Sequence, residues 1–197
     1  MEKYSTIIIG GGAAGICAAI SKARSGQSVL ICEKLPQPGK KILASGNGRC
    51  NLLNDDLNEN YYNPAARTLV KSIFSRFGKK EIIDFFTGLG LEIYSQDGRI
   101  FPRTNQSASV LKVLDMELKR LNVPVEYNFS CSKVLFGQNA IKVSSEDGRQ
   151  MECQKLIVTG GGRTYPALGS DGSTQELARK MGHTIILTVS SAVPLVV

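Results

Sequence analysis

The sequence has little of what metal sites and disulfide frameworks require. Its 197 residues contain one histidine, His183, and five widely spaced cysteines that form no C-x-x-C pair: Cys17, Cys32, Cys50, Cys131 and Cys153. A structural zinc site uses about four Cys or His ligands at short spacings, and a disulfide framework uses an even number of cysteines. We therefore expect reduced thiols and no bound metal.

Long apolar runs are also missing. No run approaches the roughly eighteen residues that a membrane-spanning helix needs. In the N-terminal stretch MEKYSTIIIG, glycines follow before the apolar core of a signal peptide could form. The composition, 42% hydrophobic and 21% charged residues, is typical of a globular protein. We expect a cytoplasmic protein without a membrane partner.

The positive charge is concentrated in the first quarter of the chain. The formal net charge is +7, and residues 1–51 carry Glu2 and Glu33 against Lys3, Lys22, Arg24, Lys34, Lys40, Lys41 and Arg49. Phosphate binding in this region would explain the excess. A solvated cationic face and a nucleic-acid surface are the alternatives that charge leaves open.

The first 34 residues predict a β-α-β unit. Residues 4–10, YSTIIIG, form a β-branched apolar run without alternation, as expected of a strand buried on both faces of a parallel sheet. Small and apolar residues at helical spacing follow over residues 13–24, and Gly26 is a stop signal. A second buried strand over residues 28–34 carries Glu33 near its end. The connection between the two strands is expected to be right-handed.

A glycine motif lies between the first strand and the helix. Gly10, Gly12 and Gly15 have G-x-G-x-x-G spacing, and Glu33 follows eighteen residues after Gly15. In dinucleotide-binding folds, such glycines allow a tight turn, a close approach to a pyrophosphate and close helix packing, while the acidic residue binds the ribose. The pattern predicts a nucleotide site at Gly10, Gly12, Ala13, Ala14, Gly15, Glu33 and Lys34. A glycine-rich turn without a ligand is the alternative.

The rest of the chain predicts an irregular, partly helical excursion over about residues 52–105, with helices over 64–78 and 79–91 and a hairpin at Asp97-Gly98. A helix over 107–121 and a three-stranded β meander over about 123–153 follow. A buried strand over 155–162 and a helix over 171–183 come last. The apolar tail TIILTVSSAVPLVV is an unusual end for a domain, so we expect a truncated chain.

A second glycine cluster bears on the identity of the cofactor. The segment KLIVTGGG places Thr159, Gly160 and Gly161 at the end of a strand that could return to the same crevice. FAD enzymes of the glutathione-reductase type bring a late strand end of this kind against the cofactor, so fold analogy favours FAD. A purely structural turn is the alternative.

Three segments carry a family resemblance: GKKILASGNGRCNLLN, TGGGRTYPALGSDG and ELARKMGH. With them the chain resembles, over essentially its whole length, the bacterial three-domain flavoproteins known as the NAD(P)/FAD-dependent oxidoreductase or aminoacetone oxidase family. That family includes members linked to bile-acid dehydroxylation and to dihydrouridine formation in ribosomal RNA. Its members are roughly twice as long, so this chain resembles their N-terminal half. The chain departs from the family at Thr164 and at Thr174-Gln175.

The resemblance implies that the loop over residues 39–51 runs along FAD toward the flavin ring. Its cations Lys40, Lys41 and Arg49 would then offset pyrophosphate charge or stabilise an anionic reduced flavin. The cofactor-binding residues that the resemblance adds are Lys41, Ser45, Gly46, Gly48, Arg49, Cys50, Asn51, Val134, Thr159, Gly160 and Gly161.

No residue stands out as a catalytic base or nucleophile. Cys50 has no resolving cysteine beside it, and His183 is better explained as a helix C-terminal residue than as a catalyst. Arg103 and Asn105 could face a substrate, although N-capping of the next helix by Asn105 or Ser107 explains that segment equally well. Arg163 and Tyr165 are candidates for a position near the flavin. The catalytic residues stay unknown.

The sequence thus predicts an α/β, glutathione-reductase-like FAD domain that spans the chain and contains a β meander. The predicted function is two-electron hydride transfer between FAD and a small organic substrate, either amine oxidation or reduction of an activated double bond. NAD(P)H is a candidate electron donor. Reduction of uridine in ribosomal RNA and an FAD-binding module without activity of its own are the alternatives.

Overall fold

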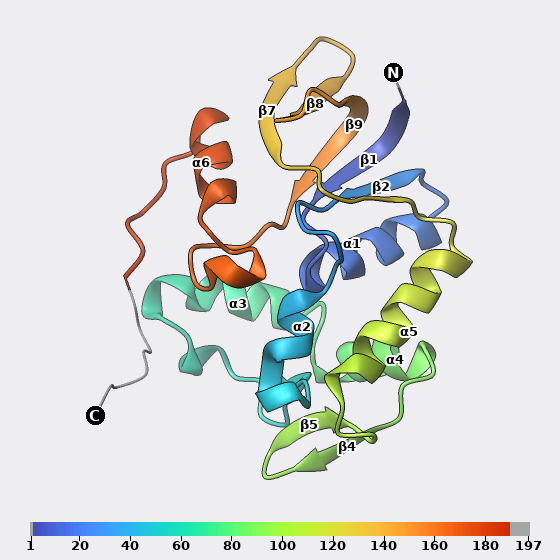
Figure 1. Cartoon of the computed structure of the whole chain (residues 1–197). Helices are drawn as coiled ribbons and strands as arrows, with labels where there is room; N and C mark the ends of the chain where they lie inside the picture. The colour runs from blue at the N-terminus through green and yellow to red at the C-terminus, as the bar shows by residue number, and fades with distance from the viewer. Residues whose placement is uncertain (1, 190–197) are drawn as a thin grey trace. The chain divides into compact units, whose positions relative to one another are not determined.

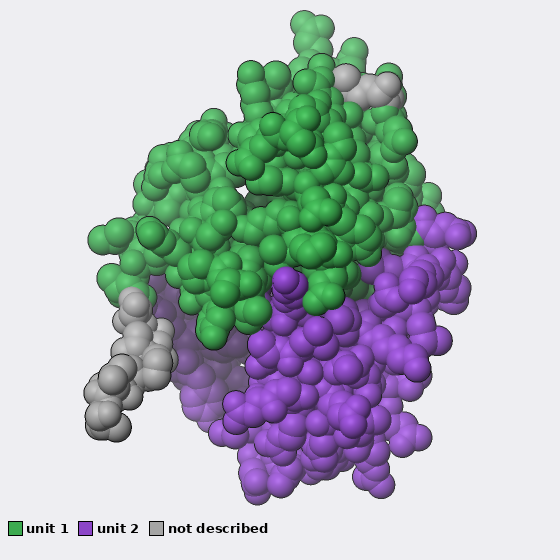
Figure 2. Space-filling view, viewed as in Figure 1, with its two compact units in different colours: residues 1–38, 123–197 green, residues 39–122 purple. Residues whose placement is uncertain are grey.

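The structure is a computed structural model that describes residues 2–189. It divides into two compact units, shown in different colours in Figure 2. The first unit comprises the described parts of residues 1–38 and 123–197, and the second comprises residues 39–122. The excursion expected over residues 52–105 lies within the second unit.

The first unit is built on a six-stranded sheet with the order β6-β2-β1-β9-β8-β7. Its first two strands along the chain are β1 (Lys3–Ile9) and β2 (Val29–Cys32), which run parallel and are connected by α1 (Ala13–Arg24) (Figure 1). The remaining strands are β6 (Val125–Glu126), β7 (Cys131–Phe136), β8 (Ile141–Ser145) and β9 (Gln150–Val158). A short 3-10 turn, Pro166–Leu168, and α6 (Ser173–Lys180) follow β9.

Burial explains why the first two strands lack alternation. Ile7 and Ile8 are both inaccessible to solvent although their side chains point to opposite faces, and every residue of β2 is buried. The buried residues of α1 are Gly15, Ile16, Ala19 and Ile20, at helical spacing. The predicted α/β fold with a parallel sheet is confirmed.

The strand pairing around β9 differs from the prediction. β9 is one continuous strand that pairs antiparallel with β8 through Gln150–Cys153 and parallel with β1 over nearly its whole length. The expected break between residues 153 and 155 is therefore wrong. The antiparallel meander consists of β7, β8 and β9, because β6 pairs parallel with β2 instead. A two-residue strand has no periodicity from which its partner could be predicted.

The second unit contains helices and a small sheet of order β3-β5-β4. The strands are β3 (Leu53–Asn54), β4 (Ile93–Gln96) and β5 (Arg99–Pro102), and the hairpin between β4 and β5 turns at Asp97 and Gly98 as predicted, both with positive φ. Its helices and 3-10 turns are α2 (Lys40–Ala44), Ser45–Gly48, Glu59–Tyr61, Pro64–Ala66, α3 (Arg67–Phe74), α4 (Lys79–Gly88) and α5 (Ser107–Arg120).

The C-terminal prediction is tested only in part. The last helix is shorter than expected, and Asp171 accepts a hydrogen bond from Ser173 N at 3.0 Å just before it. Residues 184–189 form neither helix nor strand, and the end of the apolar tail, residues 190–197, lies outside the described residues. Within residues 2–189, no helix has both the length and the apolar character to cross a membrane. The same residues contain no cluster of three or more potential metal ligands.

Candidate functional site

The turn between β1 and α1 passes very close to the loop that follows β9. Gly10 has φ +103° and donates its N–H to Cys32 O at 2.8 Å. A Cβ atom at Gly10 would lie 2.7 Å from Gly160 Cα, so a larger residue would not fit at this position. The structure thus brings together the two glycine clusters that the sequence separates by about 150 residues.

Gly15 allows α1 to begin against this turn. A Cβ atom there would lie 1.9 Å from Gly10 O and 2.7 Å from Thr159 Oγ1. The Thr159 hydroxyl lies 2.9 Å from both Ile9 O and Gly10 O, and Thr159 N donates to Ile9 O at 2.8 Å. Thr159, which follows β9, is therefore hydrogen-bonded to the glycine turn.

Gly12, in contrast, borders open space. It is the N-cap of α1, and a Cβ atom built on it would have no atom of residues 2–189 within 4 Å. Ala13 and Ala14 are exposed, and within the described chain the first turn of α1 has neither a side-chain cap nor an acidic residue. An exposed helix N-terminus of this kind directs backbone N–H groups and the positive end of the helix dipole outward. The geometry suits a phosphate group.

Glu33 lies beside the same turn. It is buried, and its two carboxylate oxygens each accept a backbone hydrogen bond, Oε2 from Gly11 N at 2.6 Å and Oε1 from Leu35 N at 2.8 Å. Each oxygen has a second lone pair available for another donor. Gly11 was not among the predicted site residues, although it stands inside the motif. Its N–H fixes the carboxylate next to the N-terminus of α1.

Lys34 has a partner that the sequence did not predict. Its Nζ lies 2.8 Å from Asp171 Oδ1 and 3.3 Å from Ser173 Oγ, at the start of α6. The hydrogen bond from Lys34, with those from Ser173, holds the pKa of the Asp171 carboxyl well below its usual range. The Thr174 side chain packs on the loop after β9, since a Cβ atom at Gly160 would lie 2.1 Å from Thr174 Oγ1. Lys34 and Thr174 thus connect α6 to the strand ends.

Val134 lies on β7, three strands from β1 in the order of the sheet. Its side chain packs against the core cluster that contains Ile9, Cys32 and Phe129. Packing accounts for this residue without a ligand. Its predicted cofactor contact stays a prediction, as does that of Gly161, which has φ +83° in the loop after β9.

In the second unit, the loop over residues 39–51 folds into α2 and a 3-10 turn. Positive φ values recur at Gly46 (+57°), Asn47 (+53°), Gly48 (+82°) and Cys50 (+60°). Such values are rare for residues other than glycine and asparagine, which makes Cys50 a strained position. The turn is held by hydrogen bonds from Cys50 N to Ser45 O at 3.0 Å and from Ser45 Oγ to Ile42 O at 2.7 Å.

Arg49 and Cys50 each have a structural explanation. The Arg49 guanidinium carbon lies 4.3 Å from the centre of the Phe101 ring, and its Nη1 donates to Gln96 Oε1 at 3.3 Å. Burial raises the pKa of the Cys50 thiol above its ordinary value. Because the thiolate is the reactive form, this environment does not activate Cys50 as a nucleophile. Lys41 lies on α2, and Asn51 is exposed after the turn.

The remaining candidate residues belong to both units: His183, Tyr165 and Arg163 to the first, and Asn105 to the second. His183 N caps α6 by donating to Ala178 O at 3.1 Å. Tyr165 is exposed, and Arg163 lies beside Gly172. Asn105 has φ +54° and accepts a hydrogen bond from Tyr94 OH at 2.5 Å.

The capping prediction for α5 was wrong. The N-cap of α5 is Gln106, and within the described residues no side chain caps this helix. The Ser107 hydroxyl donates instead to Leu43 O at 2.9 Å. Arg103 N donates to Glu92 O at 2.8 Å, next to the β4–β5 hairpin.

Comparison with known proteins gives relatives that cover nearly the whole chain. It is 41% identical over 190 residues to a 3-dehydro-bile acid delta(4,6)-reductase of Clostridium scindens, with 95% of this chain and 46% of the relative covered. It is 28% identical over 195 residues to a ribosomal RNA dihydrouridine synthase of Escherichia coli, with 98% and 48% covered. The chain thus spans about half the length of these relatives.

Among solved structures, the fold is similar to that of a 3-ketosteroid-delta4-(5alpha)-dehydrogenase from Rhodococcus jostii RHA1. The TM-score is 0.64 at 14% identity, with 82% of this chain and 46% of that chain covered. Since the identity is low, this likeness shows the fold alone. The model of the HI0933-like protein Rossmann domain matches residues 4–194. The resemblance seen in the sequence is confirmed, and the chain belongs to the HI0933-like Rossmann domain family.

Proposed function

We propose that the first unit binds FAD, with the pyrophosphate at the N-terminus of α1 and the adenosine ribose at Glu33. The observation that carries this proposal is the contrast among the motif glycines. Gly10 and Gly15 are packed against backbone, whereas Gly12 borders open space at an exposed helix N-terminus. A diphosphate group fits such a cradle, and the Glu33 carboxylate is fixed next to it by Gly11 N.

We also propose that the complete protein is an FAD-dependent oxidoreductase that reduces an activated double bond in a small organic substrate. When bound, FAD supplies the two-electron chemistry, and the residues of this chain bind and orient it. The relative that is 41% identical is named a delta(4,6)-reductase, which favours double-bond reduction over amine oxidation. NAD(P)H is the proposed electron donor.

A second candidate is the reduction of uridine in ribosomal RNA. Two relatives, 28% and 30% identical, are named ribosomal RNA dihydrouridine synthases, and the net charge of +7 is compatible with a polyanionic partner. This candidate predicts RNA binding whose affinity falls steeply with salt. Binding that does not respond to salt would count against it.

The cofactor roles of Lys41, Ser45, Gly46, Gly48, Arg49, Cys50 and Asn51 in the second unit rest on the family resemblance. The contact of Arg49 with Phe101 is a structural role that does not require a ligand. Single alanine variants, measured for FAD affinity and for thermal stability together, separate the two roles.

The test is the absorption spectrum of the purified chain with and without added FAD. We expect stoichiometric uptake and the flavin absorption band near about 450 nm. Gly12→Val should abolish uptake while the chain stays folded. Gly88→Val is the matched control, because a Cβ atom at Gly88, at the end of α4, would also have no described atom within 4 Å. A folded parent chain that takes up no FAD would show the proposal to be wrong.

A further inference from the structure

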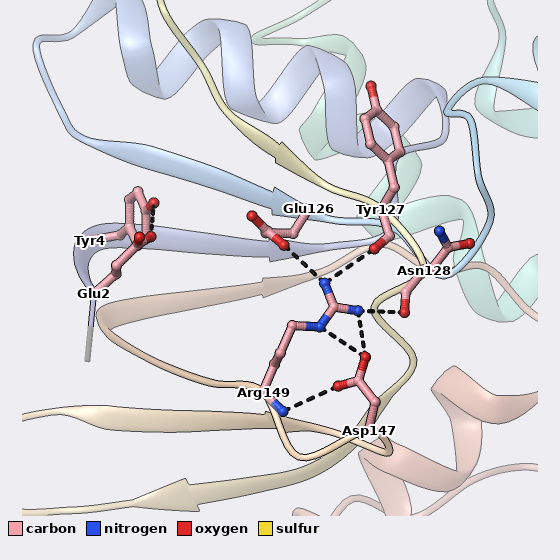
Figure 3. Close-up of polar contacts among 7 residues, drawn as sticks. All are labelled: Glu2, Tyr4, Glu126, Tyr127, Asn128, Asp147 and Arg149. Atoms are coloured by element: carbon pink, nitrogen blue, oxygen red, sulfur yellow. Dashed lines mark hydrogen bonds and ion pairs between the residues drawn. The ribbon is translucent and has the colours of Figure 1, made fainter.

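Arg149 follows the turn between β8 and β9 and contacts each of residues 126–129, called the 126–129 segment, of which Figure 3 shows Glu126, Tyr127 and Asn128. Its Nη1 donates to Glu126 Oε2 at 2.9 Å and to Tyr127 O at 3.2 Å, and its Nη2 donates to Asn128 O at 2.7 Å. The guanidinium carbon also lies 5.2 Å from the centre of the Phe129 ring, which is buried.

Asp147 holds the guanidinium in the orientation that these contacts need. Arg149 Nε donates to Asp147 Oδ2 at 2.8 Å, and Nη2 lies 2.7 Å from the same oxygen. A guanidinium has five N–H donors in a fixed plane. With Asp147 at one edge and the 126–129 segment at the other, each of the three nitrogens of Arg149 has an acceptor.

The 126–129 segment in turn holds the backbone of Glu33. Glu33 N donates to Glu126 O at 2.8 Å, and Glu33 O accepts from Phe129 N at 2.9 Å. Both backbone polar groups of Glu33 are therefore bound by the segment that Arg149 holds. The position of the Glu33 Cα atom, from which the carboxylate reaches Gly11 N, depends on this segment.

We propose that Arg149 is a positioning residue for the Glu33 carboxylate and thereby sets how strongly the site recognises the hydroxyls of the adenosine ribose. This inference rests on the proposed FAD function. Arg149 does not itself touch the nucleotide, because it acts through the backbone of the 126–129 segment. Lysine cannot replace it, since one ammonium group cannot reach two carbonyl oxygens and two carboxylates in a single plane.

The experiment compares the affinities for FAD and for an FAD analogue whose adenosine lacks the 2′-hydroxyl. A hydrogen bond to a charged group is worth enough that the parent chain should prefer FAD by about tenfold. In Arg149→Met and Arg149→Lys we expect the preference to fall to about twofold or less, as in Glu33→Gln. In the double variant Glu33→Gln/Arg149→Met, the preference should fall no further than in Glu33→Gln alone.

The ratio of the affinity for FAD to that for the analogue, rather than the affinity for FAD alone, distinguishes a positioning role of Arg149 from a general role in the stability of the fold. A purely structural Arg149 would weaken FAD and the analogue by the same factor, and an unchanged preference in a folded variant would overturn the inference. If Arg149→Met does not fold, the preference for FAD over the analogue is measured in Arg149→Lys instead. Arg179→Met is the matched control, because Arg179 pairs with Glu176 on α6 in the same unit, and its preference should stay near tenfold.

The proposed function and the inference fail in different ways. A parent chain that binds no FAD contradicts the proposed function, and the inference falls with it. A parent chain that binds FAD and the analogue equally well keeps the proposed binding of FAD at the N-terminus of α1 but overturns the inference, because Glu33 would then not recognise the 2′-hydroxyl.

Discussion

Alanine at Gly15 and alanine at Gly12 should have opposite consequences, although both glycines belong to one motif. At Gly15, the new Cβ atom would lie 1.9 Å from Gly10 O. The usual carbon–oxygen contact is about 3.3 Å, so the backbone would have to move by more than about 1 Å. At Gly12, the Cβ atom would meet no atom of the described residues within 4 Å, and φ is −80°.

The magnitudes follow from these distances. At Gly15, overpacking against backbone should lower the free energy of unfolding by about 3 kcal/mol, and the better helix propensity of alanine should raise it by about 1 kcal/mol. The net loss of about 2 kcal/mol corresponds to a fall in Tm of about 4–8 °C for a chain of this size. At Gly12, the loss of the glycine N-cap and the lower entropy of the unfolded chain nearly cancel, so we expect a change within about 0.5 kcal/mol.

Two assays separate the outcomes. Thermal unfolding followed by circular dichroism should show that Gly15→Ala is destabilised and Gly12→Ala is not. FAD titration should show the reverse order for binding, with Gly12→Ala losing about tenfold or more in affinity because its methyl group enters the proposed pyrophosphate cradle. Equal destabilisation of the two variants would refute the reasoning, since it would mean that Gly12 is packed like Gly15.

Three further predictions concern charged groups of the first unit. Glu33→Gln should lose about 1–3 kcal/mol in urea unfolding, because an amide has only one acceptor for two backbone N–H donors; unchanged stability would contradict the two hydrogen bonds. Arg149 lowers the pKa of Asp147 from 3.8 to about 2, so its stabilisation is present above about pH 4 and is lost as the pH falls through about 2. Asp147→Asn should therefore flatten the acid side of the stability profile in that range, and an unaltered profile would argue against this ion pair. A double-mutant cycle with Lys34→Met and Asp171→Asn should give a coupling of about 0.2–1 kcal/mol, because both side chains are partly exposed; a coupling near zero would mean that the ion pair does not form in solution.

The sequence was most informative where local pattern and tertiary structure agree. The β-α-β unit was predictable because the apolar run of β1, the glycine turn and the small residues of α1 each point to the same arrangement. The role of Gly15 also followed from the motif, because the close helix packing that it permits is built into the spacing.

Other features depend on contacts between distant residues and have no local signal. Arg149 has a local partner in Asp147, but its partners Glu126 and Asn128 lie 23 and 21 residues away in the sequence. The pairing of β6 with β2 involves only two residues of each strand. Lys34 was predicted as a residue of the nucleotide site, and only the fold reveals Asp171 beside it.

The continuity of β9 joins two parts of the first unit into one cooperative segment. Gln150–Cys153 pair with β8 on one edge of β9 and Glu152–Val158 pair with β1 on the other, so the antiparallel and the parallel ladder share Glu152 and Cys153. Separating β8 from β9 would therefore disturb residues that also pair with β1. Slow hydrogen exchange should therefore extend along all of β9 rather than stop where its pairing with β8 ends.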